Sequence, residues 1–107
     1  MVKRFDIFLL NLDENLSSDN AKNSRPCMVV SPDEMNKNID SVVVAPISSV
    51  TRKYPTRILF EFLGKERAVV LDQIKTVEKV RLVKKIGEIE REIQSQILET
   101  LQEMFAE

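Results

Sequence analysis

The chain has 107 residues, of which 43% are hydrophobic and 31% charged, so it suffices for one domain with a core and is too apolar for a disordered protein. It contains no histidine and one cysteine, which excludes a Ser-His triad, a His-ligated metal, a Cys-rich zinc site and a disulfide framework. Residues 86–107 carry six acids against one arginine, a charge of −5, whereas residues 1–85 carry +4. A basic body with an acidic end fits a protein that meets phosphate or an acidic peptide, and also one with two merely solvated faces.

The first half of the chain predicts two strands separated by a long polar loop. Residues 5–12 are rich in large apolar side chains and predict a strand, and residues 13–24 are mostly Asn, Asp and Ser. A loop of this length in a small domain is usually functional or mobile. A second strand is expected over residues 27–31, followed by a short helical turn with Ser31 as its N-cap and Pro32 at its first position.

The middle of the chain predicts three more strands. The β-branched run at residues 41–47 predicts a central strand, whose regular pairing Pro46 should end. A polar connection follows over residues 48–56 and includes the basic and aromatic side chains of Arg52, Lys53 and Tyr54. Residues 57–62 and 68–72 alternate around a turn and predict a hairpin.

The last segment changes to helical periodicity. Apolar side chains at a spacing of three and four predict one stripe of a helix over residues 86–105, formed by Ile86, Ile89, Ile93, Ile97, Leu101 and Phe105. Strands followed by a terminal helix predict a single α+β domain over residues 1–107, built on a small curved antiparallel sheet.

Polar side chains at the ends of three predicted strands are candidates for chemistry. Arg25 is held by Pro26 and can fork onto a phosphate or cap a loop carbonyl. Ser48 and Ser49 can donate to a phosphate oxygen or stabilise a turn. Asp72 would suit a general base if burial raised its pKa, but it can also pair with a nearby arginine.

Two further sequence features set expectations about environment. Cys27 begins an apolar strand and is expected to be a buried, inert thiol. A free thiol, with no export signal and no membrane-spanning stretch in the sequence, suggests the cytoplasm and no membrane contact.

The order of these clusters resembles the MazF/PemK family of toxin ribonucleases. The resemblance rests on four motifs in sequence: Arg25-Pro26, Ser31-Pro32, residues 45–49 (Ala-Pro-Ile-Ser-Ser) and residues 70–82 with their Leu-Asp-Gln-Ile-Lys-Thr core. It implies the CcdB/PemK-type barrel with a C-terminal helix, a homodimer, and RNA bound across the subunit interface. It also implies an antitoxin whose acidic, disordered tail occupies the same groove, and operator DNA as a target of the toxin–antitoxin complex.

The resemblance implies metal-free cleavage of single-stranded RNA without a cofactor. The ribose 2′-hydroxyl attacks the adjacent phosphate and leaves a 2′,3′-cyclic phosphate and a 5′-hydroxyl end. By motif, Arg25 stabilises the phosphate charge, Ser48 binds the scissile phosphate and Asp72 is the base. The residues expected to bind substrate are Ser49, Gln73, Lys75, Lys22 and Asn23.

Three positions depart from the family pattern. Phe5 stands where the family has Gly before Asp6, the loop before Arg25 lacks the Gly-x-Glu-Gln segment, and Val70 stands where PemK-like members have an acid-acting Arg. Two alternatives therefore stay open: a non-catalytic member that binds antitoxin and DNA, and a gyrase poison of the CcdB kind.

Overall fold

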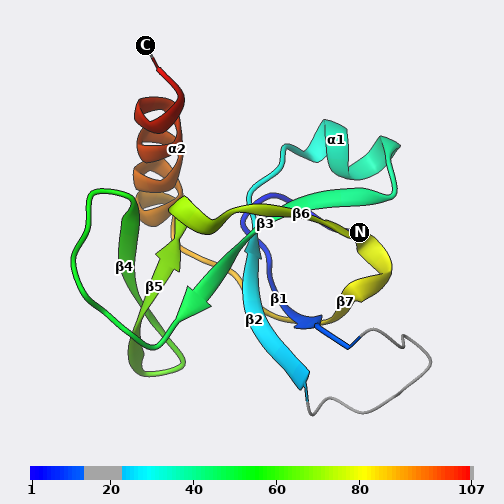
Figure 1. The fold of residues 1–107 in the computed structure, drawn as a ribbon, viewed down its shortest axis with the longest axis horizontal. Helices are drawn as coiled ribbons and strands as arrows, with labels where there is room; N and C mark the ends of the chain where they lie inside the picture. The colour runs from blue at the N-terminus through cyan, green and yellow to red at the C-terminus, as the bar shows by residue number, and fades with distance from the viewer. Residues whose placement is uncertain (14–22, 107) are drawn as a thin grey trace.

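Seven antiparallel strands and two helices make up the fold of the computed structural model, which describes residues 1–13 and 23–106 (Figure 1). The strands are β1 (Ile7–Asn11), β2 (Ser24–Val29), β3 (Ser41–Ser48), β4 (Arg57–Phe62), β5 (Lys65–Val70), β6 (Lys75–Glu78) and β7 (Leu82–Gly87). The helices are α1 (Asp33–Asn38) and α2 (Arg91–Phe105), and short 3-10 turns occupy Leu71–Gln73 and Lys79–Arg81. The expected α+β class with a terminal helix is confirmed.

The sheet has the order β4-β5-β3-β2-β1-β7, and β6 pairs with the first half of β3. β3 therefore has different neighbours along its length. Its Ser41–Val44 segment pairs with β6, its Val44–Pro46 segment with β2, and Ile47 and Ser48 with β5. Figure 1 shows β3 crossing from the β1-β2-β7 side to the β4-β5 hairpin.

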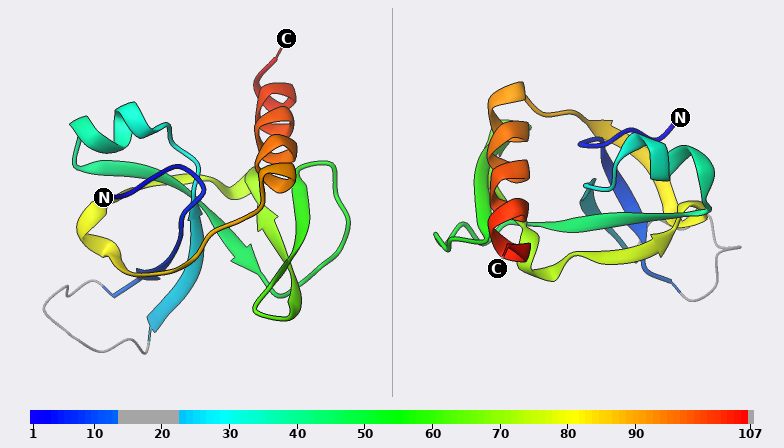
Figure 2. Two further views of the ribbon diagram at one scale, coloured as in Figure 1. Left: turned by 180° about the vertical axis from the view of Figure 1, so that it is seen from behind. Right: turned by 90° about the horizontal axis from the view of Figure 1, so that it is seen from above.

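Alternation along β3 separates two hydrophobic clusters. Ala45 and Ile47 belong to the first cluster, which includes Phe60, Leu71 and the fully buried Ile97 of α2. Val42 and Val44 belong to the second cluster, which is completed by Leu10, Cys27 and Val29. Since successive side chains of a strand point to opposite faces, one strand supplies both clusters. Both views of Figure 2 place α2 beside the β4-β5 hairpin, over the first cluster.

Several boundaries differ from the predictions. β1 begins at Ile7, β2 begins at Ser24, and β5 runs from Lys65 to Val70 rather than over residues 68–72. Pro46 does not end the pairing of its strand, because it faces Cys27 in the β2 register and β3 continues to Ser48. The missing proline N–H is tolerated at the point where β3 changes partners.

The strands β6 and β7 were not predicted, and the terminal helix is shorter than expected. Ile86 lies in β7 and Ile89 in the connection, yet both pack against the first cluster, which explains their place in the helical spacing. Phe105, the last member of the expected stripe, is 71% exposed. Among the described residues, no helix is both long enough and apolar enough to cross a membrane.

The short helix α1 is also capped differently from the prediction. Pro32, not Ser31, is its N-cap, and it makes no side-chain capping bond. The buried Ser31 hydroxyl instead donates to Asn36 Oδ1 at 2.6 Å and accepts the N–H of Val43 at 3.0 Å. Ser31 therefore fastens α1 to β3 and leaves no buried hydroxyl without a partner at this junction.

Phe5 has a left-handed backbone, with φ of +77°. This conformation favours glycine, the residue that the family pattern has at this position. The Phe5 N–H donates to the Val29 carbonyl at 2.6 Å, and the Val29 N–H donates to the Asp6 carbonyl at 2.9 Å. The Phe5 side chain is buried in the first cluster, so packing and hydrogen bonds hold the strained backbone.

Candidate functional site

Arg25 lies on β2, opposite Leu10 of β1, and is exposed. Its guanidinium makes one described contact, in which Nη1 donates to the Ser24 carbonyl at 3.0 Å. This is the loop-capping bond that the sequence left open as an alternative. A guanidinium has five N–H donors, so the remaining donors are available to a bound anion.

Ser48 ends β3 and is half-buried, and its Oγ accepts the N–H of Val50 at 3.0 Å. This contact is the turn-stabilising bond expected of serine. Because Oγ is the acceptor here, the hydroxyl hydrogen remains free to donate to a ligand oxygen. Ser49 is exposed and follows directly.

Register places Arg25, Ser48 and Lys75 on one face of the sheet. Cys27 faces Pro46 across β2 and β3, and Val44 faces both Val29 and Lys75. Residues that face one another in an antiparallel register point to the same side, as do residues two apart along a strand. These three polar residues therefore border the second cluster, the cluster that contains Cys27 and Val44. We call this side of the sheet the basic face.

The electrostatics of Cys27 agree with this placement. Burial raises the pKa of the Cys27 thiol to about 12, and the positive charge of Lys75 opposes the rise. Lys75 is exposed yet near enough to act on a thiol that is only 2% exposed. The expectation of a buried, inert thiol is confirmed, since a thiol with such a pKa is almost entirely protonated at neutral pH.

Asp72 contradicts the expectation of a raised pKa. Its Oδ1 lies 3.2 Å from Arg57 Nε and accepts the Thr56 hydroxyl at 2.9 Å, while its Oδ2 accepts from Arg57 Nη2 at 3.4 Å. The hydrogen bond from Arg57 lowers the pKa of Asp72, and the side chain is 36% exposed, so burial does not dominate. The alternative of a pairing arginine is the one that the structure shows.

The sequence did not single out Arg57. It begins β4 and faces Val70 of β5, which lies two residues before Asp72. The register of the predicted hairpin therefore indicated that Arg57 and Asp72 lie close together. Its guanidinium carbon lies 4.8 Å from the centroid of the Tyr54 ring, within the range of a cation–π contact. The bond to Asp72 raises the pKa of Arg57.

The remaining predicted residues are placed unevenly. Gln73 is exposed in the 3-10 turn after β5, and the Asn23 carbonyl accepts the N–H of Leu12 at 2.9 Å. Lys22 lies outside the described residues. Within the described ranges, no hydrogen bond or ion pair joins Arg25, Ser48 and Asp72 to one another. Asp72 contacts Thr56 and Arg57 instead.

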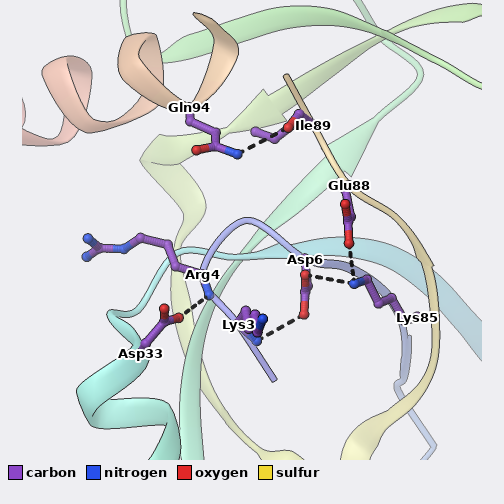
Figure 3. Close-up of polar contacts among 8 residues, drawn as sticks. All are labelled: Lys3, Arg4, Asp6, Asp33, Lys85, Glu88, Ile89 and Gln94. Carbon is purple, nitrogen blue, oxygen red and sulfur yellow. Dashed lines mark hydrogen bonds and ion pairs between the residues drawn. The ribbon is translucent and has the colours of Figure 1, made fainter. Parts of the chain in front are cut away.

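A second polar cluster joins the N-terminal segment to β7 (Figure 3). Lys85 Nζ lies 3.2 Å from the buried Asp6 carboxylate and 2.6 Å from Glu88 Oε1, and Asp6 also accepts the Lys3 N–H at 2.9 Å. The bonds to Glu88 and Asp6 raise the pKa of Lys85, and Lys85 lowers the pKa of Glu88. Each of these charged side chains has a partner within the cluster, so we assign it a structural role and not a catalytic one.

Across residues 1–13 and 23–106, no three or more His, Cys, Asp or Glu side chains are grouped as ligands for a metal ion.

Comparisons with known proteins give one consistent family. The model of the PemK-like, MazF-like toxin of type II toxin-antitoxin system matches residues 3–105. A curated relative, the endoribonuclease EndoA of Bacillus subtilis (strain 168), is 31% identical over an alignment of 108 positions that covers 95% of this chain and 92% of the relative.

Solved structures share the fold. An endoribonuclease in complex with its cognate antitoxin from a mycobacterial species has a TM-score of 0.80 at 20% identity, covering 96% of this chain and 93% of that chain. The MazE-MazF structure (Form-II) from Deinococcus radiodurans has a TM-score of 0.79 at 18% identity, covering 98% of this chain and 95% of that chain. These likenesses confirm the CcdB/PemK-type fold that the sequence resemblance implies.

Proposed function

This chain belongs to the family of PemK-like, MazF-like toxins of type II toxin-antitoxin systems, and from that premise we propose that it is an endoribonuclease that cleaves single-stranded messenger RNA at short sequences without a metal ion. A curated relative is named an endoribonuclease, and so are structural relatives from mycobacterial species. The observation that supports the proposal is the basic face: in the registers of β2, β3 and β6, Arg25, Ser48 and Lys75 point to the same side of the sheet.

The reaction is an internal transfer at phosphorus. The ribose 2′-oxygen bonds to the adjacent phosphorus, the bond from phosphorus to the 5′-oxygen breaks, and the products are a 2′,3′-cyclic phosphate and a 5′-hydroxyl end. The 2′-hydroxyl gives its proton to a base, and the leaving 5′-oxygen takes a proton from water. The pentacoordinate phosphorus carries extra negative charge, so fixed donors around it accelerate the step.

We assign to Arg25 the stabilisation of the negative charge that develops on the phosphate. Its guanidinium stays protonated, which makes it an electrostatic stabiliser rather than a proton donor. Ser48 donates its free hydroxyl hydrogen to a non-bridging oxygen of the same phosphate. Lys75, Ser49, Gln73, Lys22 and Asn23 are assigned to binding the rest of the strand.

Asp72 is assigned to the 2′-hydroxyl proton. The ion pair with Arg57 keeps its carboxylate ionised at neutral pH. Its Oδ2 accepts only a long bond, at 3.4 Å, and so has room for a ribose hydroxyl. A lowered pKa makes it a weak base, which places more of the rate acceleration on Arg25.

Partners and location follow from the same family. We propose that the chain acts as a homodimer in the cytoplasm, where messenger RNA is found. A cognate antitoxin occupies the basic face, and the complex of the two binds operator DNA. One structural relative is a complex with its cognate antitoxin.

The experiment is the mapping of cut sites on a long RNA, by primer extension, in the presence of a chelator. We expect discrete cuts with 5′-hydroxyl ends, and a loss of about 100- to 1000-fold in rate for Arg25→Ala, the range found when one transition-state donor is removed. Arg67→Ala is the matched control, because Arg67 lies beside Pro26 and Ile47 on the opposite face. Cleavage that requires Mg²⁺ would show that the mechanism is wrong, and no cleavage by the wild type would favour a non-catalytic or gyrase-directed role.

A further inference from the structure

The connection between β3 and β4 carries an aromatic and cationic cluster, to which the proposed reaction assigns only the ion pair between Arg57 and Asp72. Tyr54 and Arg57 are the first and last residues of a turn, in which the Arg57 N–H donates to the Tyr54 carbonyl at 3.1 Å. Pro55 occupies the second position, where its fixed φ favours such turns. The turn brings the Arg57 guanidinium over the Tyr54 ring, at 4.8 Å from its centroid.

The stack is held from three sides. Asp72 accepts two bonds from Arg57, Thr56 donates to the same carboxylate, and Arg52 Nη1 donates to the Tyr54 hydroxyl at 3.2 Å. The Leu71 N–H donates to the Thr56 carbonyl at 3.0 Å, which ties the turn to the end of β5. The ring and the guanidinium are therefore held in place before any ligand arrives, so little ordering cost remains.

The ring is nevertheless accessible. Tyr54 is 43% exposed. The guanidinium lies over one face of the ring, so a base would stack on the opposite face. Arg52 donates to the ring hydroxyl and Lys53 directly precedes the ring, so cations are available near it for the phosphate groups next to a stacked base.

The stack lies on the same side of the sheet as Ser48. Ser48 faces Ala68, Ala68 faces Leu59, and Arg57 lies two residues before Leu59 on β4. Two strand spacings across and two residues along give a separation on the order of 12 Å between the Ser48 and Arg57 backbones. One short single strand can contact both positions.

We propose that the Tyr54–Arg57 stack is a base-stacking subsite, which binds one unpaired nucleobase of the RNA next to the link that is cut. This proposal rests on the proposed function for its ligand, and it assigns a binding role to a turn without a recognised motif. Asp72 then has a second role: through Arg57 it positions the guanidinium and the ring.

The test uses the ring itself as the reporter. The sequence contains one tyrosine and no tryptophan, so intrinsic fluorescence comes from Tyr54 alone. The probe is a short 2′-O-methyl RNA of mixed sequence, which lacks the attacking hydroxyl and cannot be cut. We expect it to quench the fluorescence, after correction for absorbed light, while the same sugar–phosphate chain with abasic positions binds weakly and quenches little.

Variants of Tyr54 separate the contribution of base stacking from that of side-chain size. Their affinity is measured by the fluorescence anisotropy of the labelled probe. Tyr54→Leu should weaken binding roughly 5- to 150-fold, the value of one lost base stack, and Tyr54→Phe should stay within about 2-fold. Equal binding by the leucine variant, equal quenching by the abasic chain, or quenching by an acidic peptide but not by RNA would each overturn the subsite. Because the probe cannot be cut, a wild type that binds through Tyr54 but cleaves no RNA would contradict only the proposed function.

Discussion

Arg57 lies opposite Val70 in the β4–β5 register, and its guanidinium reaches two residues along the chain to the carboxylate of Asp72 at 3.2 Å. A cross-strand residue, Arg57, therefore supplies a cation beside Asp72. PemK-like proteins have an arginine two residues before this Asp, and Val70 stands there in this chain. The positive charge comes from another strand, so a comparison of aligned motifs does not find it.

The first prediction concerns the titration of Asp72. Arg57→Ala removes the main cause of the lowered pKa, so the Asp72 midpoint should move up toward its ordinary value. In the wild type, the stability that comes from this lowered pKa is present above the unfolded-state pKa and is lost as pH falls through the folded-state pKa. In Arg57→Ala, the stability lost as pH falls should be smaller than in the wild type.

Carboxyl carbon chemical shifts followed by NMR across the acid range give the midpoint. Arg67→Ala is the control, since its described hydrogen bond goes to the Glu66 carbonyl and not to Asp72. An unchanged Asp72 midpoint in Arg57→Ala would show that the ion pair is not formed in solution.

The second prediction is that a glycine variant at position 5 is more stable than an alanine variant, the reverse of the usual order. At an ordinary strand or helix position, glycine is less stable than alanine, but Phe5 has a φ of +77°. Both Phe5→Ala and Phe5→Gly lose the buried ring and should be destabilised by several kcal/mol, about 3–5 for a buried phenylalanine. The glycine variant should be more stable than the alanine variant by about 1 kcal/mol. Urea unfolding of the two variants measures the difference, and an alanine variant at least as stable as the glycine one would contradict the left-handed backbone.

The third prediction distinguishes two apolar positions of α2. Ile97 is fully buried in the first cluster, so Ile97→Ala should cost about 2–5 kcal/mol. Phe105 is 71% exposed, and Phe105→Ala should change the free energy of unfolding by less than about 0.5 kcal/mol. Thermal or urea unfolding gives both values. Similar costs at the two positions would mean that the end of α2 packs against something else in solution, such as a second subunit.

The fourth prediction concerns the lone thiol. With its pKa near 12 and 2% of its surface exposed, Cys27 should react with a thiol reagent at neutral pH only when the second cluster opens. The rate should therefore rise steeply with urea below the unfolding transition. The unfolded chain in high urea provides the reference rate, and fast labelling of the native protein would contradict the buried position.

The sequence predicted the elements that bury a face and missed those that do not. β3, the β4–β5 hairpin and α2 have clear apolar patterns, and each contributes to a cluster. β6 and the middle of β7 are mostly exposed and rich in lysine, so their alternation carries little hydrophobic signal. Ile86 and Ile89 were assigned to the helix because their spacing continues its stripe, although their contact with the first cluster comes from an extended chain.

The residues of the candidate site could be predicted from the sequence, but the contacts and pKa of Asp72 could not. Motif order led to Arg25, Ser48 and Lys75, and register places them on one side. The state of Asp72 was not predictable, because its pKa depends on Arg57, fifteen positions away, and on the turn at Pro55. Spacing along a chain does not report contacts that a hairpin creates.

The shared strand β3 has a consequence for unfolding. Its alternate side chains belong to the two clusters, so a β3 that separates from β2, β5 and β6 takes Ala45 and Ile47 out of the first cluster and Val42 and Val44 out of the second. The first and second clusters should therefore lose their buried side chains in the same event. The amides of β3 should accordingly exchange with solvent only through global opening, and melting should be a single event despite the two interiors.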